Sequence, residues 1–128
     1  MIIVVAALSI TAAAGLHLWM FILESVLFGR PTVHRMLEVR AEHVRAVRPW
    51  AFHQGVYNLV LATTAIAGLV ALLLGRDGPG RILVMAACAG MLLAGVALFV
   101  FDPRLARLPG MLAQALPALV AVVTTPLQ

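Results

Sequence analysis

The sequence predicts an all-α membrane protein: a bundle of four antiparallel transmembrane helices, with a short cytoplasmic amphipathic helix between the first and the second. Two features of its composition point this way. The chain has 128 residues, of which 63% are hydrophobic and 11% charged, whereas about a quarter of the residues in a soluble domain are charged. The apolar residues also form four stretches, at 2–28, 50–74, 82–101 and 109–127. Each reaches or approaches the roughly 20 residues that cross a hydrocarbon core of about 30 Å.

The first stretch, 2–28, is expected to be a retained transmembrane helix. Ala12, Ala13 and Ala14 resemble the cleavage site of a signal peptide, but the positively charged region that precedes the apolar part of such a peptide is missing. Cleavage after Ala14 would also leave too few residues to span a bilayer. With three more apolar stretches following, we expect residues 1–128 to form a single integral membrane domain.

The connection between the first two stretches is long and amphipathic. Its apolar residues at 33, 36, 37, 44 and 47 fall near helical spacing, with charged residues on the other side. This pattern predicts a short helix at the membrane surface that Pro49 ends. The later connections are short: the segment 75–80 is rich in glycine and predicts a tight turn. Asp102 and Pro103 end the third helix, and Pro109 starts the fourth.

The arginines predict the orientation of the chain in the membrane. All nine basic residues are arginines. Seven lie in the connections after the first and third stretches, and only Arg76 and Arg81 lie on the opposite side. By the positive-inside rule, the arginine-rich connections are cytoplasmic, and both termini face the outer side of the cell membrane. The net charge of +4 therefore concerns membrane orientation, so we expect the lipid bilayer as a partner and no nucleic acid.

Polar side chains inside the apolar stretches indicate a candidate site, because polar groups in hydrocarbon are costly without partners. In the first stretch, His17 and Glu24 are seven residues apart and share one helix face. In the fourth, Gln114 lies among small residues. The start of the second stretch carries four polar side chains that fit within an arc of roughly 140°: His53, Gln54, Tyr57 and Asn58.

Three of these residues are expected at one depth in the membrane. Glu24 lies four residues before the cytoplasmic end of its stretch, Gln54 four after the start of its own, and Gln114 five after. At about 1.5 Å per residue, all three lie some 6–8 Å below the same membrane surface. The sequence therefore predicts a half-open polar pocket on the cytoplasmic side, beneath the amphipathic helix.

The first functional hypothesis is a membrane-embedded enzyme that acts on a lipophilic small molecule by acid–base chemistry, of isomerase, cyclase or hydrolase type. A carboxyl group in low dielectric keeps its proton more readily, so Glu24 suits a general acid. His17 or His53 would be its catalytic partner. The substrate would be oriented by four hydrogen-bonding side chains: Gln54, Tyr57, Asn58 and Gln114.

Hypotheses from two other classes stay open. In one, the protein binds or transports small hydrophobic or cationic compounds as a homo-oligomer, with Glu24 as counter-ion or proton-coupling site. In the other, the polar residues only join helices of a structural subunit, at about 0.6 kcal/mol per bond. Metal binding is conceivable through two sets of residues. The first is His17, Glu24 and His53, but two helical turns separate His17 from Glu24. The second is His34, Glu38 and His43, which suits a solvated helix face. We therefore expect neither a metal nor a cofactor.

These residues also carry a family resemblance. The runs His17-Leu-Trp-Met-Phe-Ile-Leu-Glu24, Gln54-Gly-Val-Tyr-Asn58 and Gln114-Ala-Leu-Pro-Ala118 resemble the small bacterial membrane proteins grouped as domain of unknown function 1304. The likeness covers nearly the whole chain and implies four helices with the same polar positions. The chain departs from the family pattern at Leu16, His53 and Ala115, where the family usually has Glu, Asn and Gly. The family implies a fold and a site but no activity.

Overall fold

The computed structural model describes residues 1–127, and over that part of the chain it is helical and contains no strand. Three segments are long and apolar enough to cross a membrane, which confirms the expected helical membrane class: Ile2–Val26, Ala41–Leu73 and Asp77–Phe101. The fourth apolar helix, Leu108–Thr124, has 17 residues. The elements in order are α1 (Ile2–Phe21), η1 (Ile22–Val26), α2 (Pro31–Met36), η2 (Ala41–His43), α3 (Val44–Leu73), α4 (Asp77–Phe101), η3 (Leu105–Arg107), α5 (Leu108–Thr124) and η4 (Thr125–Leu127).

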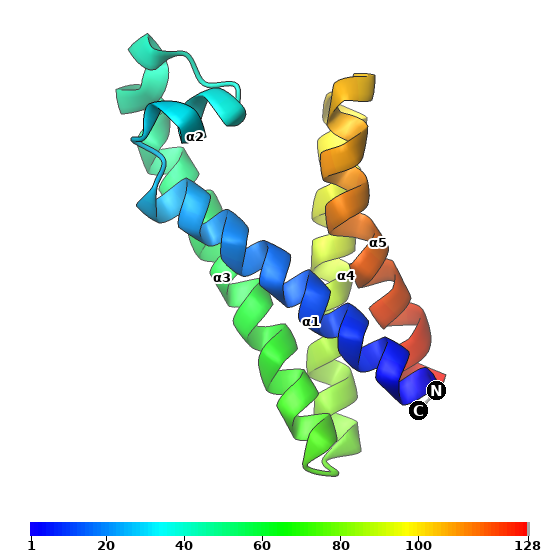
Figure 1. Ribbon diagram of the computed structural model, residues 1–128. Helices are drawn as coiled ribbons and strands as arrows, with labels where there is room; N and C mark the ends of the chain where they lie inside the picture. The colour runs from blue at the N-terminus through cyan, green and yellow to red at the C-terminus, as the bar shows by residue number, and fades with distance from the viewer. Residues whose placement is uncertain (128) are drawn as a thin grey trace.

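The long helices form two pairs that separate towards one end (Figure 1). α1 packs against α3 and α5, and α4 packs against the same two helices. Both ends of the chain lie away from α2, towards the end where α3 turns into α4. The buried core consists mostly of small side chains, which let helices approach closely where lipid supplies no hydrophobic drive: Ile10, Ala13, Ala14, Ala62, Ala65, Val84, Ala87, Cys88, Met91, Ala118 and Ala121.

The closest approach of α3 and α4 occurs at glycines. A Cβ atom added at Gly68 would lie 2.8 Å from the backbone nitrogen of Val84 and 3.0 Å from the carbonyl oxygen of Gly80. One at Gly80 would lie 2.9 Å from the backbone nitrogen of Leu72. Because these neighbours are backbone atoms, they cannot move aside as a flexible side chain would. The two helices are therefore held together near their shared turn by glycine.

That turn is tight, as the sequence predicts. The N–H of Gly75 donates to the carbonyl of Leu72 (3.0 Å), and the N–H of Arg76 donates to that of Ala71 (2.9 Å). This bonding pattern ends a helix through a residue at positive φ, here Gly75 at 72°. α4 then begins at Asp77, five residues before the expected start at 82.

The connection before α3 differs from the single amphipathic helix expected there. α2 ends at Met36, and Glu38 follows in the left-handed region with φ 59°. A non-glycine residue in that conformation interrupts a helix. α3 starts at Val44 and contains Pro49, so Pro49 does not end a helix as predicted. Pro49 has a helical φ, lacks the N–H that would bond to the carbonyl of Arg45, and crowds that carbonyl, so it weakens the helix there without ending it.

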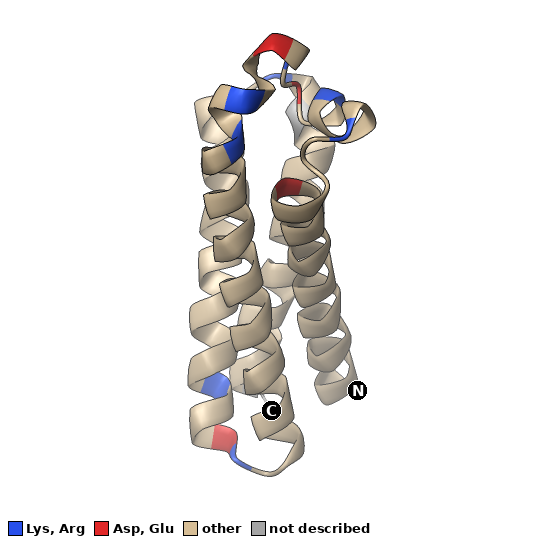
Figure 2. Cartoon of the chain, turned by 90° about the vertical axis from the view of Figure 1, so that its left-hand side faces the viewer, with Lys and Arg blue, Asp and Glu red and all other residues tan. Residues whose placement is uncertain are grey.

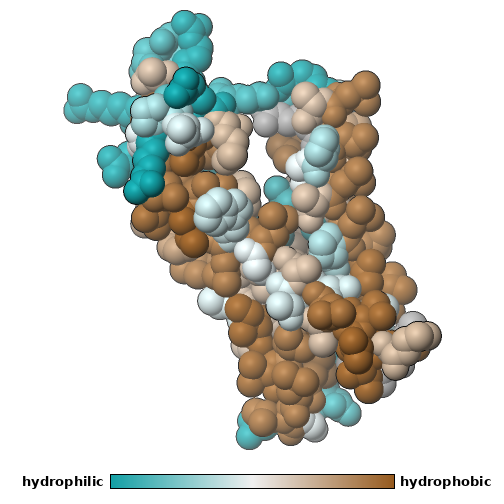
Figure 3. Space-filling model, in the orientation of Figure 1, coloured by the Kyte–Doolittle hydropathy of each residue, from teal (hydrophilic) through white to brown (hydrophobic). Residues whose placement is uncertain are grey.

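Charged residues gather at the end of the bundle that carries α2 (Figure 2), with a smaller group at the α3–α4 turn. The space-filling view shows hydrophobic helix surfaces between these hydrophilic ends (Figure 3). Large apolar side chains are exposed along this surface, among them Leu8, Ile82, Leu93 and Val100, each at 66–73% of full exposure. Such a surface fits lipid and not water.

Replacement of Gly68 by Ala is expected to destabilise the bundle by about 1–3 kcal/mol, because the added methyl group meets backbone atoms of α4. The free energy of unfolding in detergent measures this. Gly78→Ala is the matched control, since Gly78 lies in the first turn of α4 with nothing within 4 Å of an added Cβ. Equal stability of the two variants would contradict the close α3–α4 contact.

Candidate functional site

A π-helical turn, η1, carries Glu24 at the end of the first span. The N–H of Leu27 donates to the carbonyl of Ile22, five residues earlier, at 2.9 Å. Single turns of this kind inside α-helices are frequent at functional sites. η1 lies directly against α3: a Cβ added at Gly55 would be 2.1 Å from Oγ of Ser25. The Ser25 hydroxyl in turn donates to the carbonyl of Phe52 (3.2 Å). The widened turn and Gly55 together fix Glu24 beside α3.

Glu24 has a hydrogen bond to α3. Nδ2 of Asn58 donates to Oε2 of Glu24 at 2.7 Å, and Asn58 is 7% exposed. This pair joins residues 34 positions apart in the chain. The partner of the carboxyl group is thus a neutral amide.

The Glu24–Asn58 pair lines a cavity between the separating helix pairs. Its volume is about 580 Å³, within the range of small-molecule sites in proteins. Figure 3 shows the opening between the two helix pairs, beneath a hydrophilic bridge. The polar lining residues are Glu24, Gln54, Asn58 and Gln114. The apolar ones are Met20, Leu37, Ala94, Ala97, Leu98 and Gly110.

An ion pair joins the segments that follow α2 and α4. Arg104, which follows α4, binds Glu38, which follows α2, with 2.9 Å between a guanidinium nitrogen and Oε2. The same guanidinium donates to both carboxylate oxygens of Asp102, at 2.6 and 2.5 Å. Asp102 and then Glu38 raise the pKa of Arg104 above its ordinary value, so Arg104 stays charged. Nothing in the sequence indicated this pair, because its members are 66 residues apart.

The other residues predicted for the site lie outside the cavity lining. His17 is buried in the bundle at 1% exposure, where its Nδ1–H donates to the carbonyl of Ala13 (2.9 Å). His53 and Tyr57 are exposed, with their rings edge to face at 5.8 Å between centroids. Each lies one residue, about 100° of helix rotation, before a cavity residue, Gln54 or Asn58. The 140° arc predicted from the sequence therefore covers both the inner and the outer surface of α3.

The structure thus brings together Glu24, Gln54, Asn58 and Gln114, and it does not bring His17, His53 or Tyr57 to them. No three His, Cys, Asp or Glu side chains within residues 1–127 are grouped so as to hold a metal ion. Neither metal set considered from the sequence is assembled; Nδ1 of His34, for example, donates to the carbonyl of Val39 (2.9 Å). Met20, Leu37 and Leu98 could not be predicted as lining residues from the sequence, because apolar residues of this kind occur throughout the chain.

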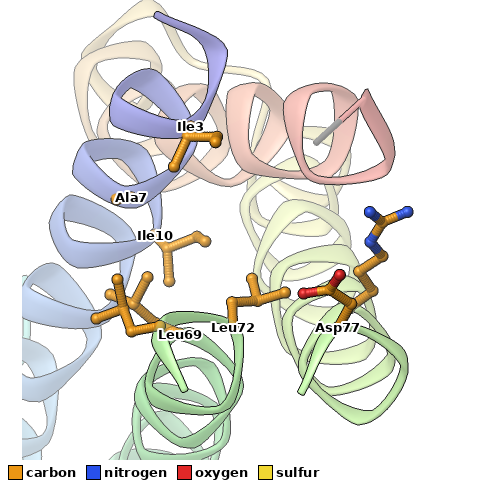
Figure 4. A pocket seen from close by; sticks show the side chains of 8 residues that line it. Ile3, Ala7, Ile10, Leu69, Leu72 and Asp77 are labelled. Carbon is orange, nitrogen blue, oxygen red and sulfur yellow. The ribbon is translucent and has the colours of Figure 1, made fainter. Parts of the chain in front are cut away.

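A second, smaller cavity of about 190 Å³ lies at the opposite end of the bundle, near the α3–α4 turn (Figure 4). Ile10, Leu69 and Leu72 form its apolar wall, and Asp77 stands at its edge. Its volume is about a third of that beside Glu24, and its lining offers hydrocarbon more than hydrogen bonds. The larger cavity is therefore the better candidate site.

Apolar helices around an open cavity with a single carboxyl group define a small helical membrane protein with a candidate ligand site. Residues 11–125 match the family described as "Protein of unknown function (DUF1304)". The chain belongs to this family, which confirms the resemblance seen in its three motifs. No curated protein and no solved structure matches the chain.

The hydrogen bond between Glu24 and Asn58 is expected to couple the two residues energetically. In a double-mutant cycle of Glu24→Ala and Asn58→Ala, the coupling should be about 0.6–2 kcal/mol, the range for interhelical bonds in membranes and bonds to carboxylates. The free energy of unfolding in detergent is the measurement. Glu24→Ala with Gln114→Ala is the control: Gln114 has no hydrogen bond to Glu24, so their effects should add. Additive effects for Glu24 and Asn58 would contradict the bond.

Loss of the Arg104–Glu38 pair is expected to open the hydrophilic end of the cavity. Gly110 lines the cavity with open space for a side chain, so Gly110→Cys in a Cys88→Ala background reports access by its reaction with a water-soluble maleimide. Arg104→Gln should raise that rate roughly two- to fivefold, since an exposed ion pair contributes up to about 1 kcal/mol. Arg76→Gln, at the other end of the bundle, should leave it unchanged. Equal rates for both variants would rule out the pair as a closure.

Proposed function

We propose that this protein binds a lipophilic small molecule with a cationic or hydrogen-bonding head group, in the cavity beside Glu24. One observation carries the proposal. Glu24 lies in a largely apolar cavity, its hydrogen-bond partner is a neutral amide, and no arginine or histidine is among the lining residues. A carboxylate in such surroundings is costly unless it takes up a proton or a cation neutralises it. The lining does not supply the cation, so a cationic ligand would supply it, and a protonated Glu24 would donate a hydrogen bond to a neutral head group.

The rest of the cavity suits an amphiphilic ligand. Gln54 and Gln114 add amide groups on the walls formed by α3 and α5, and Leu37, Ala97 and Leu98 offer hydrocarbon contact. The opening between the helix pairs would admit a ligand from the hydrocarbon itself. A head group would then meet Glu24 and Asn58, while its chain lies between the helices.

The membrane arrangement that we propose has four spans, with α5 as the fourth. Its 17 residues extend about 26 Å at 1.5 Å per residue, which approaches the thickness of a hydrocarbon core. The segment of α2 and η2 would lie at the cytoplasmic surface of the cell membrane, and both termini on the outer side, as the arginine distribution favours. Glu24 would then lie close below the cytoplasmic surface.

Acid–base catalysis at Glu24 is the second candidate, and the π-helical turn that carries Glu24 favours it. In this alternative the carboxyl group would act alone or with a water molecule, because neither His17 nor His53 lines the cavity. Transport is a further form of the binding hypothesis and would require a homo-oligomer to line a path. The mass of the detergent-solubilised protein distinguishes it: a strict monomer would argue against transport.

The binding proposal is tested with two probes of equal chain length, decylamine and decanol, added to the protein in an uncharged detergent. Native mass spectrometry gives the bound fraction of each. Glu24→Gln should weaken decylamine binding roughly ten- to a hundredfold, as expected for loss of a charge-assisted hydrogen bond, and change decanol binding little. Glu42→Gln is the matched control, because Glu42 is exposed and paired with Arg40 outside the cavity. Equal decylamine binding by the two variants would refute the proposal.

A further inference from the structure

Another concave site, distinct from the two cavities described above, lies on the outer surface of α3, where that helix meets η1. Its volume is about 540 Å³, and it shares no lining residue with the Glu24 cavity. Its lining residues on α3 follow helical spacing along one face: Arg45, Arg48, Pro49, Phe52 and His53. Ser25 of η1 forms part of the other wall. We call this feature the arginine groove.

The arginine groove carries positive charge that the protein does not neutralise. Its lining includes two guanidinium groups and no carboxylate. Within residues 1–127, neither Arg45 nor Arg48 takes part in an ion pair or a side-chain hydrogen bond. Other arginines of the same end are engaged: Arg40 with Glu42, and Arg104 with Glu38 and Asp102. Arg45 and Arg48 are exposed, so their charge is available to an anion of another molecule.

The surroundings of the groove are aromatic and exposed. Phe52 is 52% exposed and Tyr57 60%, and the rings of His53 and Tyr57 are in edge-to-face contact. Aromatic side chains are enriched where a membrane span meets the head-group layer. From Leu59 onward the rest of α3 is mostly apolar and carries no charged side chain. A ligand with an anionic head and a hydrocarbon tail matches both parts of this surface.

We propose that the arginine groove binds the phosphate head group of an anionic phospholipid, whose acyl chain lies along Phe52 and Tyr57 on the outside of α3. The planar guanidinium group binds phosphate through two parallel hydrogen bonds, which makes arginine the favoured residue for such head groups. Basic pockets beside membrane spans bind phospholipid head groups in the same way. This proposal requires membrane insertion and does not depend on the ligand of the Glu24 cavity.

A tryptophan placed at Phe52, an exposed lining residue of the groove, serves as the reporter. In Phe52→Trp with Trp19→Phe and Trp50→Phe it is the only tryptophan, and its fluorescence is quenched by brominated acyl chains close to the groove. The protein is placed in phosphatidylcholine vesicles that contain either brominated phosphatidylglycerol or brominated phosphatidylcholine. We expect stronger quenching by the anionic lipid. In Arg45→Gln with Arg48→Gln the relative binding constant should fall roughly tenfold, towards no preference.

Arg30→Gln with Arg35→Gln is the matched control, since it removes the same charge from the same connection outside the groove. It should keep most of the preference for phosphatidylglycerol. Equal quenching by both lipids in the parent protein would overturn the proposal. An equal loss in the control variant would also overturn it, because the preference would then arise from diffuse loop charge. Circular dichroism in each sample establishes that the variants are folded.

A soluble phosphate is the other source of the same chemistry, and a separate measurement distinguishes it. Inorganic phosphate is titrated at constant ionic strength into the protein in a neutral detergent without phospholipid, with the fluorescence of the same single tryptophan at position 52 as readout. We expect no saturable response at millimolar phosphate. A saturable response that is lost in Arg45→Gln with Arg48→Gln, without a preference for phosphatidylglycerol in vesicles, would assign the groove to a soluble ligand and overturn the lipid proposal.

Discussion

The contact between α3 and α4 around Gly68 and Gly80 is the constraint on which the rest of the structure depends. It brings two helix backbones together at the end of the bundle that carries their turn. At the opposite end, Gly55 allows α1 and η1 to lie against α3, so α1 stays with α3 there and does not fill the space beside α4. Straight helices that touch at one end and diverge must leave a space at the other. The cavity is therefore a consequence of where the glycines are. Larger residues at these helix contacts would change the shape of the cavity and leave its polar lining residues the same.

The polar residues lie where this space opens. In a uniformly packed bundle Glu24 would face hydrocarbon or a neighbouring helix, and a carboxyl group there would be held only by its bond to Asn58. In the observed fold it faces an open volume, and the Arg104–Glu38 pair joins the segments that follow α4 and α2. An interhelical hydrogen bond stabilises by about 0.6 kcal/mol, which is small compared with the free-energy cost of placing a carboxyl group in the membrane. A purely structural role for Glu24 is for this reason the weakest of the three hypotheses, since an amide or hydroxyl would join the helices at lower cost.

The sequence predicted the helices and the main polar residues because both follow from short-range patterns. The lengths of the apolar stretches predicted the long helices. Counting residues from the ends of these stretches predicted one depth for Glu24, Gln54 and Gln114, and the structure places all three around one cavity. Depth is measured along a helix and is insensitive to small errors in its boundaries. The direction of a side chain around the helix axis is harder to predict, because one residue changes it by about 100°. His53 and Tyr57 therefore fall on the other surface of α3. The π-helical turn at Glu24, the left-handed Glu38 and the Arg104–Glu38 pair arise from tertiary contacts, which one sequence does not reveal.

The first turns of α3 separate two surfaces of opposite electrical character. Glu24 and Asn58 meet on the inner side, and Arg45 and Arg48 line the groove on the outer side, 13 and 10 residues before Asn58. At about 1.5 Å of rise per residue and about 10 Å of helix diameter, the two sets of charges are roughly 18–22 Å apart. At an effective dielectric constant of about 20, unit charges at that separation interact by somewhat less than about 1 kcal/mol. Unneutralised arginines therefore oppose a cation in the cavity, and a phosphate in the groove removes that opposition. Under the two proposals made above, an anionic lipid outside α3 and a cationic ligand inside it would strengthen each other's binding, although they touch no common residue. By reciprocity the effect is equal in both directions, so the lipid composition of the membrane would change the affinity of the cavity by up to about fivefold for each pair of charges.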